Sequence, residues 1–170
     1  MPLTSFSSLP GDARVWIFAS DRPLQSADAQ RLLAEADSFL GAWKAHGAPL
    51  ACAREWRDDH FLVIGVDPTV EQASGCSIDG LFRTLQKLEQ SLGTRLVAGG
   101  RVFYRDADGA VQLAGRDQLG SLASSGAITS HTEVLDPSIT NAADYRARFE
   151  RPLAESWAAQ LVPQLASRTS

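Results

Sequence analysis

Residues Ser74-Gly75-Cys76-Ser77 place a cysteine among small residues, just before an apolar helical pattern. A thiolate at a helix N-terminus is stabilised by the helix dipole and by unpaired backbone N–H groups, so its pKa falls below the usual ~8.5. The same N–H groups can receive an oxyanion or a phosphate. Cys76 is therefore the candidate nucleophile. The competing interpretation is that Ser77 caps the helix, Asp79 adds favourable charge and Cys76 is a small buried side chain. The sequence around Cys76, taken without the predicted fold, favours this interpretation.

A nucleophilic cysteine needs a base and a group that orients the base. His46 is the candidate base and Asp67 the candidate orienting carboxylate, and Arg14, Ser77 and Asp79 are candidate ligand-binding residues. These residues lie far apart in the chain, so they form one site only if the fold brings three loops to the same edge of a sheet. For His46 the simpler interpretation is a helix C-terminal histidine favoured by the dipole.

The first half of the chain alternates strand and helix patterns. Residues 13–20 have an unbroken apolar centre, which predicts a buried strand. A helix is predicted from about Ala27, with Gly47 as its C-terminal cap. Two strand patterns, residues 50–57 and 60–67, flank Asp58-Asp59 and predict a hairpin whose second arm is central because it is apolar on both faces.

The second half begins with the clearest periodicity in the chain, an apolar ladder from Ile78 to Leu92 that ends at Gly93. Asp108-Gly109 predicts another hairpin, and a short helix follows up to Gly126. Aromatic and leucine residues then recur every four positions from residue 145 to residue 161. Because Pro152 disfavours helical geometry at the residue before it, we expect two helical pieces or a kink there.

The first six elements run β-α-β-β-α-β, which predicts an α+β fold with a ferredoxin-like antiparallel sheet in the order 4-1-3-2 and both helices on one face. We expect a single domain over residues 1–170, with a sheet-and-helix core over 13–106 and a hairpin arm and C-terminal helical extension over 107–170. In this sheet the loops that carry His46, Asp67 and Cys76 would share one edge with Arg14.

The composition indicates which classes of partner and which cellular compartment to expect. The net charge is −4 and no run of Lys or Arg occurs, so we expect neither nucleic acid nor a membrane as a partner. No segment reaches the ~20 apolar residues of a membrane span, and the first residues lack a signal-peptide pattern. Two cysteines, Cys52 and Cys76, suit a reduced, cytoplasmic protein. Asp58, Asp59 and His60 offer metal ligands, but no second His or Cys follows at zinc spacing, so we expect no metal.

Five segments together resemble a family of small bacterial proteins, common in Bacteroidetes, whose members often carry the label "ABC transporter ATPase": "ARVWIF", "WKAHGAPL", "SGCSIDGL", "VFYRD" and "RPLAESW". The resemblance covers roughly residues 10 to 160 and implies no established activity. A P-loop needs G-x-x-x-x-G-K-[ST], and no glycine in this chain is followed by Lys-Ser or Lys-Thr. The sequence therefore argues against the activity that the label states.

A second likeness covers "DGAVQLAGRDQLGSLASSGAITSHTEVLD", which is similar to the hairpin, helix and G-x-I-T-x-x-T ending of bacterial GYF-type modules. Such modules bind partners. Phe103 and Tyr104 represent only part of the aromatic residues expected at the start of the pattern.

Two functions remain open. The first is a non-enzymatic cytoplasmic binding or adaptor domain without a cofactor, whose partner is a small molecule or a protein. Trp56, flanked by Arg54, Glu55 and Arg57, is a candidate anchor for such a partner. The second is a thiol-dependent hydrolase or transferase that uses Cys76, His46 and Asp67. We favour the first, because the link between His46 and Cys76 depends on the predicted fold alone.

Overall fold

The computed structural model describes residues 3–97 and 99–166, and the chain divides into two compact units. The first unit holds the chain up to residue 97 together with Pro137–Arg146. The second unit holds Gly99–Asp136 and the chain from Ala147 onward. The first unit is therefore made of two separate stretches of the chain, because a late segment returns to it.

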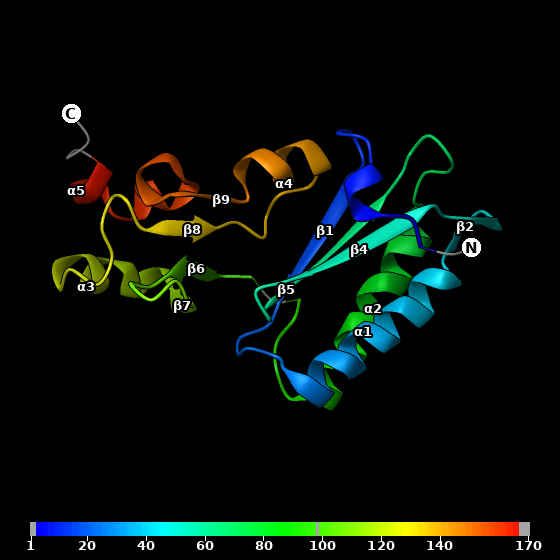
Figure 1. Ribbon diagram of the computed structural model, residues 1–170, viewed down its shortest axis with the longest axis horizontal. Coiled ribbons are helices and arrows are strands. Elements are labelled where there is room, and N and C mark those ends of the chain that lie inside the picture. The colour runs from blue at the N-terminus through cyan, green and yellow to red at the C-terminus, as the bar shows by residue number, and fades with distance from the viewer. Residues whose placement is uncertain (1–2, 98, 167–170) are drawn as a thin grey trace. The chain divides into compact units, whose positions relative to one another are not determined.

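The first unit is built on a three-stranded antiparallel sheet with two long helices (Figure 1). Its strands lie in the order β1-β5-β4, which is the predicted order of the first three strands. The elements are η1 (Phe6–Ser8), β1 (Arg14–Ala19), α1 (Ser26–Gly41), β2 (Lys44–Ala45), β3 (Ala48–Pro49), β4 (Cys52–Arg57), β5 (Phe61–Val66), α2 (Gly75–Leu92) and the first part of α4 (Ala142–Arg148).

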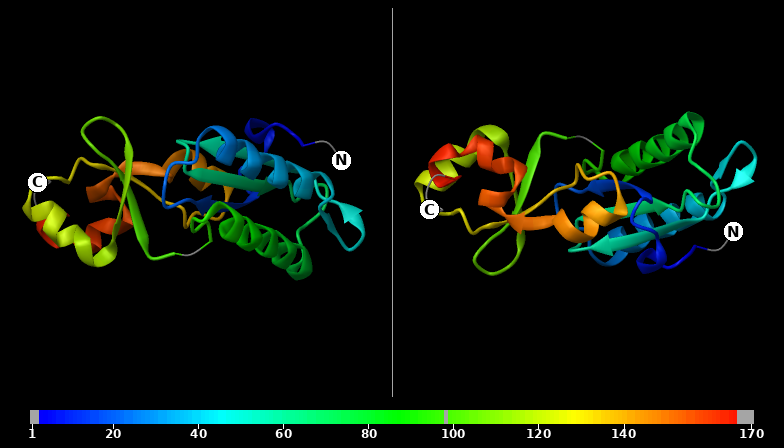
Figure 2. Two further views of the ribbon diagram at one scale, coloured as in Figure 1. Left: turned by 90° about the horizontal axis from the view of Figure 1, so that it is seen from below. Right: turned by 90° about the horizontal axis from the view of Figure 1, so that it is seen from above.

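Both long helices pack on the same face of this sheet (Figure 2). The central strand is β5, and all six of its residues are buried, as its apolar run predicts. The predicted ladder lies in α2, which buries its leucines against the sheet and ends at Gly93, whose φ of 67° is left-handed. The hydrophobic core of the first unit therefore lies between α1, α2 and the sheet.

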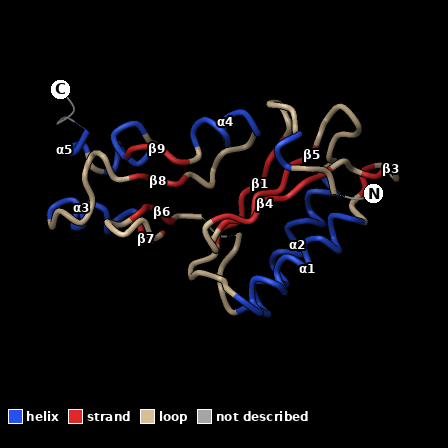
Figure 3. Tube along the Cα trace, in the orientation of Figure 1, coloured by secondary structure: helices blue, strands red, loops and turns tan. Residues whose placement is uncertain are grey.

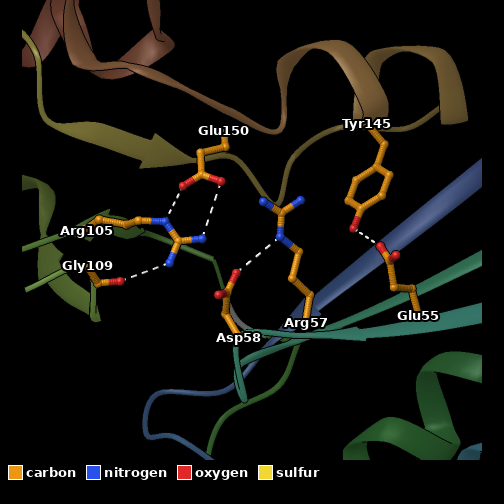
Figure 4. Close-up of polar contacts among 7 residues, drawn as sticks. All are labelled: Glu55, Arg57, Asp58, Arg105, Gly109, Tyr145 and Glu150. Carbon is orange, nitrogen blue, oxygen red and sulfur yellow. Dashed lines mark hydrogen bonds and ion pairs between the residues drawn. The ribbon is translucent and has the colours of Figure 1, made fainter.

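The opposite face of the sheet is covered by η1 and by the returning segment Pro137–Arg146. Gly65 of β5 allows this, because a Cβ there would lie 2.4 Å from Leu9 Cδ1. Arg146 donates a hydrogen bond to the Leu9 carbonyl at 2.7 Å, and Tyr145 donates one to Glu55 of β4 (Figure 4). The returning segment is therefore tied both to η1 and to the sheet.

Helix α1 is shorter than predicted. It ends at Gly41, and a small hairpin, β2–β3, follows with its turn at His46 and Gly47. Both turn residues have positive φ, 53° for His46 and 79° for Gly47. The glycine that was predicted to cap the helix instead supplies the backbone conformation of a tight hairpin turn, which favours glycine for the same steric reason.

The second unit has a four-stranded sheet in the order β7-β6-β8-β9 (Figure 3). Its core lies between this sheet, α3 and the C-terminal turns. The elements are β6 (Arg101–Arg105), β7 (Val111–Gly115), η2 (Arg116–Gln118), α3 (Leu119–Ser124), β8 (Glu133–Leu135), β9 (Glu150–Pro152), η3 (Leu153–Glu155), η4 (Trp157–Leu161) and α5 (Pro163–Ala166). The chain is thus a mixture of helix and strand, as predicted.

The four-stranded ferredoxin-like sheet is not formed. Its expected fourth strand is β6, which pairs with β7 and β8 of the second unit and not with β1. The outer edge of β1 instead meets the returning segment, through a bridge between Arg14 and Asn141 and a hydrogen bond from Val15 N to the Thr140 carbonyl at 2.9 Å. A segment distant in sequence therefore takes the place that the pattern assigned to β6.

The predicted C-terminal helices are also interrupted. Strand β9 lies between α4 and the short turns η3 and η4, and it pairs with β8. Pro152 has no backbone N–H and restricts Arg151 to extended geometry, which suits the end of an edge strand. The break at Pro152 was predicted, whereas the strand that precedes it was not.

Candidate functional site

The start of α2 is fixed by a reciprocal capping box. Ser74, not Ser77, is the N-cap: its Oγ accepts a hydrogen bond from Ser77 N at 3.2 Å. Ser77 Oγ accepts one in return from Ser74 N at 2.8 Å. The prediction that Ser77 caps the helix is wrong by three residues, because the apolar ladder starts later than the helix does. Ser77 is buried, and its hydroxyl also donates a hydrogen bond to the Ser74 carbonyl at 2.8 Å.

Cys76 lies in the first turn of α2 and is exposed. The alternative that it is a small buried side chain is therefore wrong. Asp79 is exposed one turn further along the same helix. The thiol is accessible to solvent in the first turn of an 18-residue helix.

The hairpin that carries His46 is joined to the start of α2 by Trp43. Trp43, which precedes the β2–β3 hairpin, donates its indole N–H to the Ser77 carbonyl at 2.8 Å. This bond ties the hairpin to the first turn of α2, as the prediction of a shared edge requires. His46 itself is exposed at the tip of the hairpin. Within residues 3–97, no hydrogen bond or ion pair joins His46 to Cys76 or to Asp67.

Asp67 is engaged in its own turn. Its Oδ1 accepts hydrogen bonds from Thr69 N at 2.9 Å and from Thr69 Oγ1 at 2.6 Å. These bonds stabilise the carboxylate and lower the pKa of Asp67. The carboxylate therefore closes the turn after β5, and both of these hydrogen bonds are made within that turn.

Arg14 has a different setting at the end of β1. Its guanidinium lies 4.9 Å from the centroid of the Trp16 ring, and Trp16 in turn meets Trp43 edge to face at 5.8 Å. Arg14 also lines a small cavity of about 140 Å³. The cavity is formed by the start of β1, the end of β5 and the loop before α2, and it is lined by Asp12, Arg14, Val66, Pro68, Gln72 and Ala73.

The acidic residues at the other end of the sheet have structural roles. His60 is buried, with its Nδ1 2.9 Å from the Ser20 carbonyl. Asp59 accepts a hydrogen bond from Gln25, and Asp58 pairs with Arg57 at 3.1 Å (Figure 4). Over the described residues, no three His, Cys, Asp or Glu side chains lie close enough together to hold a metal ion.

The outer edge of β4 is a feature that sequence reasoning did not find, although it singled out Trp56. The Ala51 carbonyl bonds to Asp67 N, on the side of β5, whereas the Cys52 carbonyl points the other way and accepts from Thr4 N at 3.0 Å. Because backbone groups alternate along an antiparallel strand, Arg54 and Trp56 also direct their N–H and C=O groups outward. Within the described chain these outward groups have no hydrogen-bond partner. Which backbone groups of β4 point outward depends on its hydrogen-bond register with β5, and this register is known only once the sheet order is known.

The side chains of β4 are held in place on both faces. On the helix face, Arg54 makes a two-bond ion pair with Asp37 of α1, with N–O distances of 2.6 and 2.8 Å, and this pair raises the pKa of Arg54. Trp56 is half-buried and packs against the core on the same face. On the other face, Glu55 accepts the hydrogen bond of Tyr145, whose burial raises its pKa.

Comparisons with known proteins identified no relative: no family model, no curated protein and no solved structure matches the chain. In residues 3–97 and 99–166, no helix is both long enough and apolar enough to cross a membrane.

Proposed function

We propose that the protein is a non-enzymatic binding or adaptor domain that takes up an extended segment of a partner protein along the outer edge of β4. The observation that carries this proposal is the outward direction of the backbone N–H and C=O groups of Arg54 and Trp56. An edge strand with unpaired groups is a template for another strand, and main-chain hydrogen bonds supply the affinity of such complexes.

The side chains of β4 define which segment fits. Side chains directly opposite each other on paired strands lie about 5 Å apart, where opposite charges attract and like charges repel. An antiparallel partner therefore needs an acidic residue opposite Arg57, an apolar residue opposite Trp56 and a basic residue opposite Glu55. Charges on an edge strand also discourage unselective pairing, so this pattern gives specificity. Read from its N-terminus, the partner motif is acidic–apolar–basic.

Two further features support a binding role. Trp56 offers a half-buried aromatic surface beside the open backbone, which is the residue type that anchors many interfaces. In the second unit, the hairpin β6–β7 and helix α3 follow each other in the order that the likeness to GYF-type modules implies. In its G-x-I-T-x-x-T segment, Thr132 Oγ1 accepts a hydrogen bond from Thr129 N at 2.8 Å.

The test is a binding titration with a fluorescent peptide that carries the acidic–apolar–basic motif, compared with a peptide of reversed charge order. Arg54→Pro removes the outward N–H without removing a bond to β5, and proline is tolerated at such edge positions. Arg54→Ala is the matched control, because it removes the same side chain and keeps the N–H. We expect Arg54→Pro to lose binding and Arg54→Ala to retain most of it.

Equal binding by the two variants, or equal binding of the two peptides, would show that β4 is not the docking edge. The sequence of β4 itself, Glu55-Trp56-Arg57, has the acidic–apolar–basic order. The bound segment could therefore be β4 of a second copy of the chain. Sedimentation of the free protein identifies this case, in which the protein self-associates, Arg54→Pro abolishes the association and Arg54→Ala retains it.

The thiol-dependent hydrolase or transferase is a second candidate, favoured by the exposure of Cys76 in the first turn of α2. Its chemistry needs His46 within about 3 Å of the thiol, directly or through one water. The test is the pH dependence of alkylation of Cys76 by iodoacetamide. Fast reaction near pH 6 that His46→Ala slows would support the enzyme. Reaction that follows an ordinary thiol pKa and ignores His46→Ala would dismiss it.

A further inference from the structure

We propose that the cavity beside Arg14 binds a small carboxylate. This goes beyond the proposed function, because β1 and β4 are the two opposite edges of the three-stranded sheet. The cavity is lined by a basic, an acidic and an amide residue, Arg14, Asp12 and Gln72, and by three apolar residues, Val66, Pro68 and Ala73. Neither the edge of β4 nor Cys76 is part of it.

The Arg14 guanidinium makes no ion pair within the described part of the chain. The Trp16 ring supports its guanidinium from 4.9 Å, and Trp16 is itself only 8% exposed and packed against Trp43. Asp12 lines the same cavity, yet in residues 3–97 no carboxylate lies within ion-pair distance of Arg14. The guanidinium of arginine is planar, and its forked N–H groups match a carboxylate with two parallel hydrogen bonds.

The size and charge of the cavity select the ligand. About 140 Å³ is less than half the volume of an ordinary drug-sized pocket, so the cavity fits only a small ligand. The apolar walls suit a short aliphatic stem behind the carboxylate. Asp12 brings a negative charge into the same space, which disfavours a doubly charged phosphate more than a singly charged carboxylate.

This chemistry has two sources, a free short-chain acid or the C-terminal carboxylate of a peptide. The experiment is a titration of the ¹⁵N-labelled protein followed by NMR, with sodium propionate as the probe and with sodium chloride and phosphate at equal ionic strength as references. A short peptide ending in alanine is added as free acid and as amide. We expect saturable chemical-shift changes at the Trp16 indole and at the amides of Val66 and Gln72. Changes with propionate indicate a free short-chain acid, and changes with the free-acid peptide indicate a C-terminal carboxylate.

Variants show whether Arg14 is responsible. Arg14→Met is expected to weaken binding about tenfold or more, since it removes charge-assisted hydrogen bonds. Arg31→Met, at an exposed arginine of α1 outside the cavity, is expected to change nothing. Ala73→Leu fills the cavity and leaves Arg14 intact, so it is a second route to loss of binding. Unchanged propionate shifts in folded Arg14→Met, the same shifts with chloride or phosphate, or no saturable shift would overturn the proposal.

Discussion

The two cysteines of the chain have opposite environments within the same unit. Cys52 begins β4 on the helix face of the sheet, is 2% exposed and donates a hydrogen bond from its thiol to the Leu40 carbonyl at 3.4 Å. Burial raises its pKa to about 11. Cys76 is exposed in the first turn of α2. One thiol is a packing group and the other is accessible for reaction, so residue type alone does not assign chemistry to either.

The difference arises from where each element turns its side chains. The backbone alternation of β4 directs Cys52 into the core between the sheet and α1, where a charged form has no solvation. The first turn of α2 is held by the Ser74–Ser77 capping box, which faces the interior and leaves Cys76 outside. A secondary-structure element therefore decides which of its residues are chemically available, and the contrast can be tested by changing both sites in the same way.

The largest expected effect comes from Cys52→Asp compared with Cys76→Asp. A carboxylate in place of Cys52 is buried without a partner, and we expect a loss of about 3 kcal/mol or more in the free energy of unfolding. At position 76 the same carboxylate lies in the first turn of a helix, where negative charge stabilises by about 0.3–1 kcal/mol. Urea denaturation of both variants measures the difference. Equal costs at the two positions would contradict the assigned environments.

A smaller effect is expected in the pH dependence of stability. Because the pKa of Cys52 is raised to about 11 in the folded state, the unfolded chain loses its proton first as the pH rises above about 8.5. The free energy of unfolding should therefore fall between about pH 8.5 and pH 11, by about 1.4 kcal/mol per pH unit from this group.

Denaturation of Cys52→Ala and Cys76→Ala alongside the parent protein isolates this contribution. Cys52→Ala should lose part of the alkaline slope, and Cys76→Ala should keep all of it. An identical slope in the parent protein and in Cys52→Ala would mean that the Cys52 thiol is not shielded in the folded state.

The smallest effect concerns the cap that keeps Cys76 outside. Ser74→Ala removes the side chain that accepts from Ser77 N, and we expect a loss of about 1 kcal/mol. Ser124→Ala, at the exposed end of α3, serves as the control, because its hydroxyl bonds only to the Gly120 carbonyl within the same helix. Thermal unfolding followed by circular dichroism compares the two variants. A cost at Ser124 equal to that at Ser74 would argue against a specific capping role.

Much of the first unit follows from local patterns. The apolar run of β5 predicts a strand buried on both faces, and the ladder of α2 predicts its inner face and its end at Gly93. The hairpin between β4 and β5 was placed at Asp58-Asp59, and both aspartates have a φ of 56°. These features were predictable because periodicity and turn preference act over a few residues.

The candidate site was predictable only in part. The meeting of the β2–β3 hairpin with the start of α2 was expected, but it is made by Trp43 and Ser77 and not by His46 and Cys76. Asp67 is predicted to orient His46, which is distant in sequence, whereas its carboxylate accepts a hydrogen bond from Thr69, two residues away. A hydroxyl two residues away can bond to the carboxylate at almost no entropic cost, so it competes well with a distant histidine. The sequence pattern does not show which of the two partners is preferred.

The sequence by itself determined the elements whose signal is local: the strands β1 and β5, the helix α2, and the turns that join β4 to β5 and β6 to β7. Only the tertiary structure decided which strands share a sheet. It placed β6 in the second unit and brought Asn141 to the edge of β1, across more than a hundred residues. It also directed the backbone groups of Arg54 and Trp56 outward from the sheet and formed the cavity beside Arg14. The physical reason is that strand pairing and cavity walls depend on contacts between distant residues, whose free energies compete globally, whereas helix periodicity and turn geometry are decided within a few neighbouring residues.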